Sequence, residues 1–398
     1  MNATDKPPST SGYSIPIGYL RAWITLLVVA HHSVLAYHPD APKSFTALDG
    51  ANRWWGAFPV VDPAKWQGFS LFVEANDMYF MALMFLLSGL FVWPSLRRKG
   101  AAGYARDRVL RLGLPFAIAA GLLAPIAYYT AYLQTGATGG WAGYWQVFTK
   151  PGVWASGPAW FLWVLLTFDL IVAGVTALRP HWGDTLGRMA ARVQSPTKLF
   201  AALVVVASVA HLAFEWPFGG FTWWHWGPFY IQAPRVLLYF TYFVFGIALG
   251  AYGLDQGVLS PEGPLARAWK LWINIAPVAF VAAVAAIIAA FSVSPLPPWL
   301  HLVIVVVYTL AGVAMSLASI SLFLRFARVP NPVFAALVPC AFGIYLVHYP
   351  IVSHLQYLFL GLELPGAIKG VLVTTAAVAI SWGLVAVLRK VPGVARVI

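Results

Sequence analysis

The chain has 398 residues, of which 60% are hydrophobic and only 10% are charged. Soluble domains carry about 25% charged residues, so this composition excludes an ordinary soluble protein and indicates an integral membrane protein. The formal net charge of +12 would suit a nucleic-acid-binding protein, but the basic residues lie in short loops between apolar segments. Membrane topology accounts for that placement, so we expect no nucleic-acid partner. The single cysteine, Cys340, excludes an internal disulfide and a cysteine-rich metal site.

Ten apolar segments are long enough to cross a bilayer as helices. In chain order we expect them at 17–37, 72–94, 112–133, 158–178, 199–215, 233–252, 270–291, 299–323, 334–360 and 365–388. The sequence therefore predicts an all-α fold, a polytopic membrane helical bundle. We divide the chain into an N-terminal tail 1–16, a membrane domain 17–390 and a C-terminal tail 391–398. The first apolar segment is interpreted as a retained span rather than a signal peptide.

The positive charges alternate from loop to loop. Most lysines and arginines fall near the two termini and in every second loop, and the loops between them hold only Lys43, Arg53, Lys65 and Lys150. Because cytoplasmic loops carry the excess of Lys and Arg, this pattern predicts that both termini are cytoplasmic. The opposite loops, 38–71, 134–157 and 216–232, are rich in Trp, Tyr, Gly and Pro. Their aromatic side chains suit either interfacial anchoring or stacking on sugars, and both interpretations stay open here.

The first apolar segment carries Arg21, His31 and His32. Ionisable groups cost several kcal/mol in hydrocarbon, so they indicate a functional site by default. On a helix, Arg21 and His32 share one face and lie about 16 Å apart along the axis, whereas His31 lies about 80° off that face. We expect a fixed cation near the cytoplasmic surface and a titratable base toward the other side. Hydrogen bonding to a neighbouring helix is the structural alternative for each histidine.

Other polar side chains are expected at the depth of His32, in the outer half of the bundle. They are His348 in the ninth segment, Glu74 and Asp77 near the start of the second, Trp160 at the start of the fourth and Arg235 at the start of the sixth. A base, an orienting acid and an aromatic wall are what a buried active site requires. Helix capping is the alternative for Glu74 and Asp77, and interfacial anchoring is the alternative for Arg235.

Two further motifs precede the third segment: one lies in the loop before it, and the other lies in the second segment. Arg108 and Arg111 are spaced i, i+3, so on a helix they project from one side, where two guanidinium groups can bind phosphates. Plain cytoplasmic loop charge is the alternative. The small residues Ser88 and Gly89 predict close packing between helices. The sequence holds no P-loop, GxSxG, HExxH or metal-ligand spacing, so we expect no metal.

Together these motifs resemble the acyltransferase 3 family of membrane acyltransferases. The matching residues are Arg21 and His32 with ten residues between them, Phe85-Leu-Leu-Ser-Gly89, Arg108-x-x-Arg111, Trp160-Phe-Leu162 and Tyr345-Leu-Val-His348-Tyr-Pro350. The chain looks closer to the glucan biosynthesis protein C type than to members with an appended extracytoplasmic domain. Some relatives carry a polar residue just before Trp-Phe-Leu or an acidic residue shortly after it, and this chain carries neither. Asp169, Glu74 or Asp77 would then have to replace that group.

The resemblance implies transfer of an acyl group from cytoplasmic acyl-CoA to a hydroxyl of an extracytoplasmic or lipid-linked carbohydrate. Acetyl is the expected group and succinyl the alternative. The resemblance implies His32 as general base, Arg21 orienting the CoA arm or holding a carboxylate, and Arg108 and Arg111 binding CoA phosphates. An acyl-histidine relay is a second route. His348 and the outer aromatic residues would line the acceptor side, and we assign acceptor binding to Glu74, Asp77, Trp160 and Arg235.

The expected location is a bacterial inner membrane, in contact with membrane lipid. The first alternative function is a transporter or flippase of a sugar or lipid, which would use the buried charges as a substrate pathway. Such proteins tend to contain inverted repeats, and the sequence has no visible internal repeat. The second alternative is a membrane scaffold whose buried charges are structural. CoA-dependent thiol release would distinguish the enzyme from both.

Overall fold

The computed structural model describes residues 14–44, 46–50 and 53–398, so most of the predicted tail 1–16 lies outside the described residues. The helices are α1 (Ile15–Val34), α2 (Trp54–Ala57), α3 (Gly68–Gly89), α4 (Val92–Arg108), α5 (Leu114–Ile118), α6 (Ala124–Gln134), α7 (Gly140–Phe148), α8 (Trp160–Leu178), α9 (Trp182–Arg192), α10 (Pro196–Phe218), α11 (Val236–Tyr252), α12 (Pro264–Arg267), α13 (Trp269–Phe291), α14 (Pro298–Phe326), α15 (Pro332–Leu337), α16 (Ala341–Leu358), α17 (Gly366–Leu388) and α18 (Pro392–Ala395). The two strands are β1 (Trp223–Trp226) and β2 (Phe229–Gln232).

The predicted polytopic helical bundle is confirmed. Within the described ranges, 10 helical stretches are long and apolar enough to cross a membrane. They are Ile15–Tyr37, Gly68–Gly89, Val92–Gln134, Gly157–Leu178, Pro196–Phe218, Ala233–Tyr252, Trp269–Phe291, Pro298–Phe326, Pro332–Leu358 and Gly366–Leu388. Each overlaps one of the ten segments expected from the sequence. The chain is therefore an integral membrane protein by helix length and composition.

The third stretch is longer than the sequence suggested. Instead of beginning near residue 112, the helix runs from Val92 to Gln134, with a break at Gly100, whose φ is 70°. It also contains two π-helical turns, η2 (Val109–Gly113) and η3 (Ala119–Leu123). Each turn comes shortly before a proline, Pro115 or Pro125. Because proline lacks the N–H that would bond four residues back, a widened turn lets the helix continue past it.

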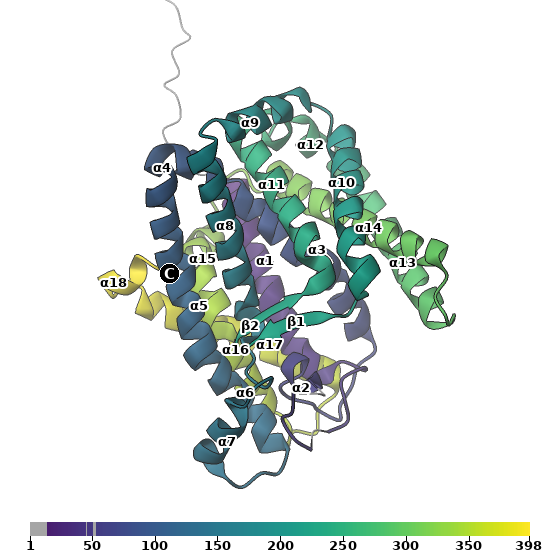
Figure 1. Ribbon diagram of the computed structural model, residues 1–398. Coiled ribbons are helices and arrows are strands. Elements are labelled where there is room, and N and C mark those ends of the chain that lie inside the picture. Colours follow the sequence, from purple (N-terminus) through teal and green to yellow (C-terminus); the bar gives the residue numbers. More distant parts are fainter. Residues whose placement is uncertain (1–13, 45, 51–52) are drawn as a thin grey trace, which may run out of the picture.

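Helix α1 forms the centre of the bundle and packs against α3, α14, α16 and α17. Figure 1 shows α9 and α12 at one end of the molecule and α2 and α7 toward the other, with the β1–β2 hairpin nearer the middle, beside α2. We call the first the basic end, because Arg97 on α4 meets α9 there through Asp184, with Nη1 and Oδ1 3.0 Å apart. We call the second the aromatic end. Arg21 lies toward the basic end of α1, and His32 lies toward its aromatic end.

The hairpin is the one part of the described chain that departs from an all-helical fold. It lies in a segment that the sequence predicted only as a Trp-rich loop. The strands pair antiparallel with Trp226 opposite Phe229, which leaves Gly227 and Pro228 as a two-residue turn. Gly227 has φ 56°, which suits the first central position of such a turn, and the ring of Pro228 fixes the next φ. Aromatic residues on both sides favour extended strands.

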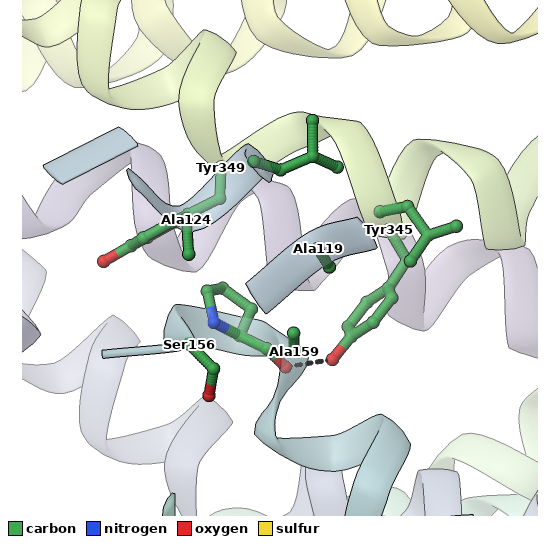
Figure 2. A pocket seen from close by; sticks show the side chains of 9 residues that line it. Ala119, Ala124, Ser156, Ala159, Tyr345 and Tyr349 are labelled. Carbon is green, nitrogen blue, oxygen red and sulfur yellow. Dashed lines mark hydrogen bonds between the residues drawn. The ribbon is translucent and has the colours of Figure 1, made fainter. Parts of the chain in front are cut away.

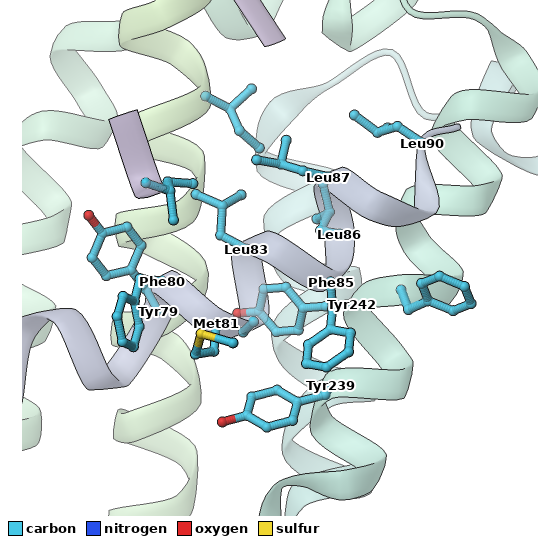
Figure 3. Packing of buried hydrophobic residues seen from close by; sticks show 14 of the residues in the cluster. Tyr79, Phe80, Met81, Leu83, Phe85, Leu86, Leu87, Leu90, Tyr239 and Tyr242 are labelled. Carbon is cyan, nitrogen blue, oxygen red and sulfur yellow. The ribbon is translucent and has the colours of Figure 1, made fainter. Parts of the chain in front are cut away.

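Small residues let α3 and α11 approach closely. A Cβ atom added to Gly89 would lie 2.2 Å from Phe243 O, and one added to Gly246 would lie 2.1 Å from Leu86 O. Around this contact, Phe85, Leu86, Leu87, Tyr239 and Tyr242 form part of the main hydrophobic core, as Figure 3 shows. The packing role predicted for the Ser88-Gly89 motif is confirmed.

Replacing Gly246 by alanine is expected to destabilise the protein by about 1–3 kcal/mol, because the new methyl group would meet a backbone carbonyl that cannot move aside. A lowered thermal unfolding midpoint of the purified protein in detergent would show this. The matched control is Gly174→Ala on α8, where the space around the added Cβ is open. An equal midpoint for the two variants would contradict the packing argument.

At the aromatic end, the loop between α1 and α3 is fixed by polar contacts. The side-chain amide of Gln134 bonds both backbone groups of Val61, each at 2.9 Å. Lys369 Nζ on α17 lies 2.7 Å from Asp62 Oδ2, and both side chains are buried. Asp62 Oδ1 also accepts from Ala64 N at 2.8 Å. These contacts hold the loop beside the cavity described next.

Candidate active site

Two histidines from different helices meet in the interior. His32 lies on α1 and His348 on α16, and His348 Nε2 is 3.2 Å from His32 Nδ1. His32 Nδ1 is also 2.8 Å from Val28 O, and His348 Nδ1 is 2.7 Å from Tyr345 O. Since α1 and α16 pack along each other, the sequence places both rings on facing helix surfaces. The pair joins residues more than 300 positions apart.

These contacts assign the protons on both rings. A carbonyl oxygen can only accept, so the nitrogen that faces it carries hydrogen. His348 Nδ1–H therefore donates to Tyr345, and His32 Nδ1–H is shared between Val28 O and His348 Nε2. In the neutral pair, His32 Nε2 is left as the nitrogen with a free lone pair. That nitrogen is the one available to take a proton from a ligand.

His32 lines a cavity of 520 Å³, a volume in the range of roughly 300–1,000 Å³ typical of small-molecule sites. The cavity lies between α1, α3, α8, α16 and the segments of the aromatic end. Its wall is largely aromatic and includes Tyr128, Trp160, Trp223, Tyr230, Tyr239 and Tyr349. A smaller hollow adjoins it, and Figure 2 shows Tyr345 and Tyr349 beside that hollow, with Tyr345 Oη donating to Pro158 O.

Asp77 and Arg235 come together in the cavity wall. Asp77 Oδ2 on α3 lies 2.6 Å from Arg235 Nη2, at the end of the short 3₁₀ helix η5 (Ala233–Arg235). Tyr308 Oη donates to Asp77 O at 3.3 Å, and its ring centroid is 5.2 Å from the Arg235 guanidinium. Trp160 also lines the cavity, with its ring stacked on Tyr239 at 5.7 Å. Glu74 is exposed and is not among the described residues that line the cavity.

Arg21 lies on the same helix as His32 but outside this cavity. Its side chain is accessible to solvent although α1 is the central helix of the bundle. The guanidinium is 5.4 Å from the ring centroid of Phe91, and it is close enough to Arg108 for the two charges to interact. No carboxylate among the described residues pairs with it. Within the part of the chain that the structure describes, Arg21 is thus an accessible cation without an ion-pair partner, toward the basic end.

Arg108 and Arg111 face different carboxylates. Arg108 Nε is 3.6 Å from Asp169 Oδ2 on α8, which also accepts from Tyr104 Oη at 2.5 Å through its other oxygen. Arg111 Nε is 3.2 Å from Asp107 Oδ1 and is half exposed. The expectation of one shared face assumed α-helical spacing, and the π turn that begins at Val109 changes that spacing. Asp169, offered from the sequence as a substitute acid, is the buried partner of Arg108.

The family model described as an acyltransferase domain, that of the acyltransferase 3 family, matches residues 17–386. The chain belongs to this family. The match covers nearly all of the membrane-spanning helices and supports membrane acyltransferase activity in general. Comparisons with curated proteins and with solved structures gave no match.

Several residues of this acyltransferase's cavity were not found from the sequence. Arg53 was counted only as a loop charge, yet its guanidinium reaches the cavity, donates to the backbone oxygens of Gly152 and Val153, and lies 4.5 Å from the Tyr230 ring centroid. Burial lowers the pKa of Arg53 from its ordinary value. Tyr345 and Tyr349 also line the cavity, whereas the sequence identified them only as part of the motif around His348 and assigned them no role of their own.

A second buried polar cluster lies outside the cavity, between α10 and α14. Glu215 Oε2 is 3.1 Å from His211 Nε2, and Glu215 Oε1 is 3.3 Å from His301 Nε2. His301 stacks on Trp216 with ring centroids 5.3 Å apart. In the described part of the chain, no group of three or more His, Cys, Asp or Glu side chains could hold a metal ion. The cluster joins α10 to α14.

Proposed function

We propose that this acyltransferase moves an acyl group from cytoplasmic acyl-CoA to a hydroxyl of an extracytoplasmic or lipid-linked carbohydrate, with His32 as general base. Acetyl is the expected group and succinyl the alternative. The observation that carries the proposal is the His32–His348 pair at an aromatic cavity, with the free lone pair on His32 Nε2. The closer resemblance to the glucan biosynthesis protein C type favours a glucan as acceptor.

In the proposed reaction, His32 Nε2 takes the hydroxyl proton as the acceptor oxygen attacks the thioester carbonyl carbon. A C–O bond forms, the C–S bond breaks and the CoA thiolate leaves with the electron pair. The proton held on His32 then passes to that thiolate, so the products are an ester and free CoA thiol. While His32 is protonated, its Nδ1–H remains bonded to Val28 O and His348 Nε2, which stabilises the cation. His348 acts as a positioning residue that holds the required tautomer.

The two substrates are proposed to approach from opposite ends. The CoA phosphates would bind near the basic end, where Arg21 is accessible and Arg111 is half exposed. The distance of about 16 Å along α1 from Arg21 to His32 is one that the extended pantetheine arm can cover. The acceptor would enter the cavity at the aromatic end. There the Asp77–Arg235 pair offers both acceptors and donors to sugar hydroxyls.

Replacing Arg21 by glutamine is expected to raise KM for acetyl-CoA by about 10–100-fold with little change in kcat, since one hydrogen bond to a charged group contributes about 1.5–3 kcal/mol. Steady-state kinetics with varied acetyl-CoA measures this. Arg98→Gln, an exposed cation at the same end, is the control and should leave KM unchanged. A fall in kcat at unchanged KM would assign Arg21 to the chemical step instead.

The direct test uses the purified full-length protein in lipid nanodiscs with labelled acetyl-CoA. We expect saturable binding of acetyl-CoA and release of CoA thiol that depends on an added glucan oligosaccharide. The label should appear in an ester of that oligosaccharide. If the folded protein binds no acetyl-CoA specifically, the proposal is wrong, and transport of a sugar or lipid becomes the function to test.

A further inference from the structure

The β1–β2 hairpin has two different faces, which its register defines. Trp223, His225, Tyr230 and Gln232 project from one face, and Trp224, Trp226, Phe229 and Ile231 project from the other. We call the first the cavity face, because Trp223, Tyr230 and Gln232 all line the cavity that contains His32. Residues of the second face do not line it.

The second face fixes the hairpin to the bundle. The ring of Trp224 lies 4.9 Å from that of Phe218 on α10, and the ring of Trp226 lies 5.8 Å from that of Trp163 on α8. Trp163 Nε1 also donates to Tyr230 O at 2.9 Å. Two helices therefore hold the hairpin, so its cavity face is presented in one orientation.

The cavity face extends the site outward from His32. Trp223 is 46% exposed although it lines the cavity. His225 is also exposed, and its ring stacks on Tyr230 with centroids 5.6 Å apart and planes 17° apart. Residues two apart on a strand are separated by about 7 Å, so Trp223 and His225 form successive contact positions along one surface. A ligand that reaches His32 can continue across them.

The chemistry of this surface suits a neutral ligand. Of the two arginines at the cavity, Arg235 pairs with Asp77. Arg53 keeps its charge, but its guanidinium donates to two backbone oxygens and lies against the Tyr230 ring. What remains are aromatic faces, the Gln232 amide, whose Nε2 also donates to Gly220 O at 2.9 Å, and the Tyr230 hydroxyl, whose oxygen is buried without a hydrogen-bond partner in the described chain. Sugar rings present C–H faces to aromatic side chains and hydroxyls to polar groups. An anionic ligand would find no free cation on the cavity face itself.

We propose that the cavity face of the hairpin is a second sugar-binding subsite, which holds a ring next to the one that is acylated. The acceptor is then a neutral glycan chain of the glucan type rather than a free monosaccharide. A cavity of 520 Å³, in the range used by drug-sized ligands, leaves room for more than one ring. This inference rests on the proposed function, because it assigns part of the acceptor to the same site.

The test compares Trp223→Ala with Trp299→Ala, which removes an exposed indole from α14, outside the cavity lining. Binding of methyl β-glucoside and of a linear β-glucan oligosaccharide is measured by equilibrium dialysis with each full-length protein in nanodiscs, without acyl-CoA. Wild type should bind the oligosaccharide at least tenfold more tightly than the glucoside, equivalent to about 1.4 kcal/mol. Trp223→Ala should remove about that preference and leave glucoside binding unchanged. Trp299→Ala should keep both affinities.

Equal affinities of wild type for the two ligands, no binding of the oligosaccharide, or equal losses in the two variants would overturn the proposal. Because no acyl donor is present, these outcomes are independent of catalysis. A preference for the oligosaccharide without any acyl transfer in the separate acetyl-CoA assay would refute the proposed function and keep the subsite. Acyl transfer without any length preference would keep the function and refute the subsite.

Discussion

Replacing His32 by asparagine is expected to lower the rate of acyl transfer by about 10²–10⁴-fold, the contribution usual for a general base. Asparagine keeps a polar group near Val28 O and His348 Nε2 but has no nitrogen that can accept the proton. Acetyl-CoA binding should persist, because the phosphates are expected to bind far from His32. Single-turnover transfer of labelled acetyl, measured beside equilibrium binding, separates the two effects.

His31→Asn is the matched control, one position away on the same helix. His31 also lines the cavity, and its ring lies against the rings of Phe80 and His32, whereas the hydrogen bond to His348 comes from His32. We expect a rate loss of less than about tenfold for this variant, since it leaves the lone pair of His32 in place. If His31→Asn abolished transfer and His32→Asn retained it, His31 would be the base and the tautomer argument would be wrong.

Replacing Lys369 by methionine is expected to destabilise the protein by about 3–5 kcal/mol, because the substitution leaves the Asp62 carboxylate buried without its cation. Methionine has a similar length, so loss of the charge dominates over loss of packing. The pair joins α17 to the loop that borders the cavity. A large fall in the thermal unfolding midpoint of the protein in detergent would show the effect.

Two further variants test the reason for that loss. Lys369→Met combined with Asp62→Asn should recover much of the stability, because asparagine removes the unpaired charge and can still accept from Ala64 N. Lys65→Met should cost less than about 1 kcal/mol, since Lys65 Nζ makes one hydrogen bond, to Ala36 O at 3.2 Å, from a partly exposed position. If the double variant is no more stable than Lys369→Met, the buried charge is not the cause.

The sequence predicted the helical bundle well, since apolar length is a local property that each segment carries by itself. It also placed Arg21 and His32 on one helix face, because that relation needs only the helical repeat. It could not predict the π turns before Pro115 and Pro125. Because regular α-helical spacing was assumed, Arg108 and Arg111 were assigned to one surface of the helix. In the structure they face Asp169 and Asp107. The roles of both arginines toward CoA stay predictions.

The sequence by itself determined the membrane location, the number of spans and the candidate residues, because hydropathy, charge alternation and short motifs are written in local order. Only the tertiary structure decided which of those residues meet. The contact of His32 with His348 and the pairing of Asp77 with Arg235 each join distant helices, and Glu74 stays outside the cavity. The two faces of the hairpin and the Lys369–Asp62 pair were also found only from the tertiary structure. Such contacts depend on helix packing and strand register, which no single segment specifies.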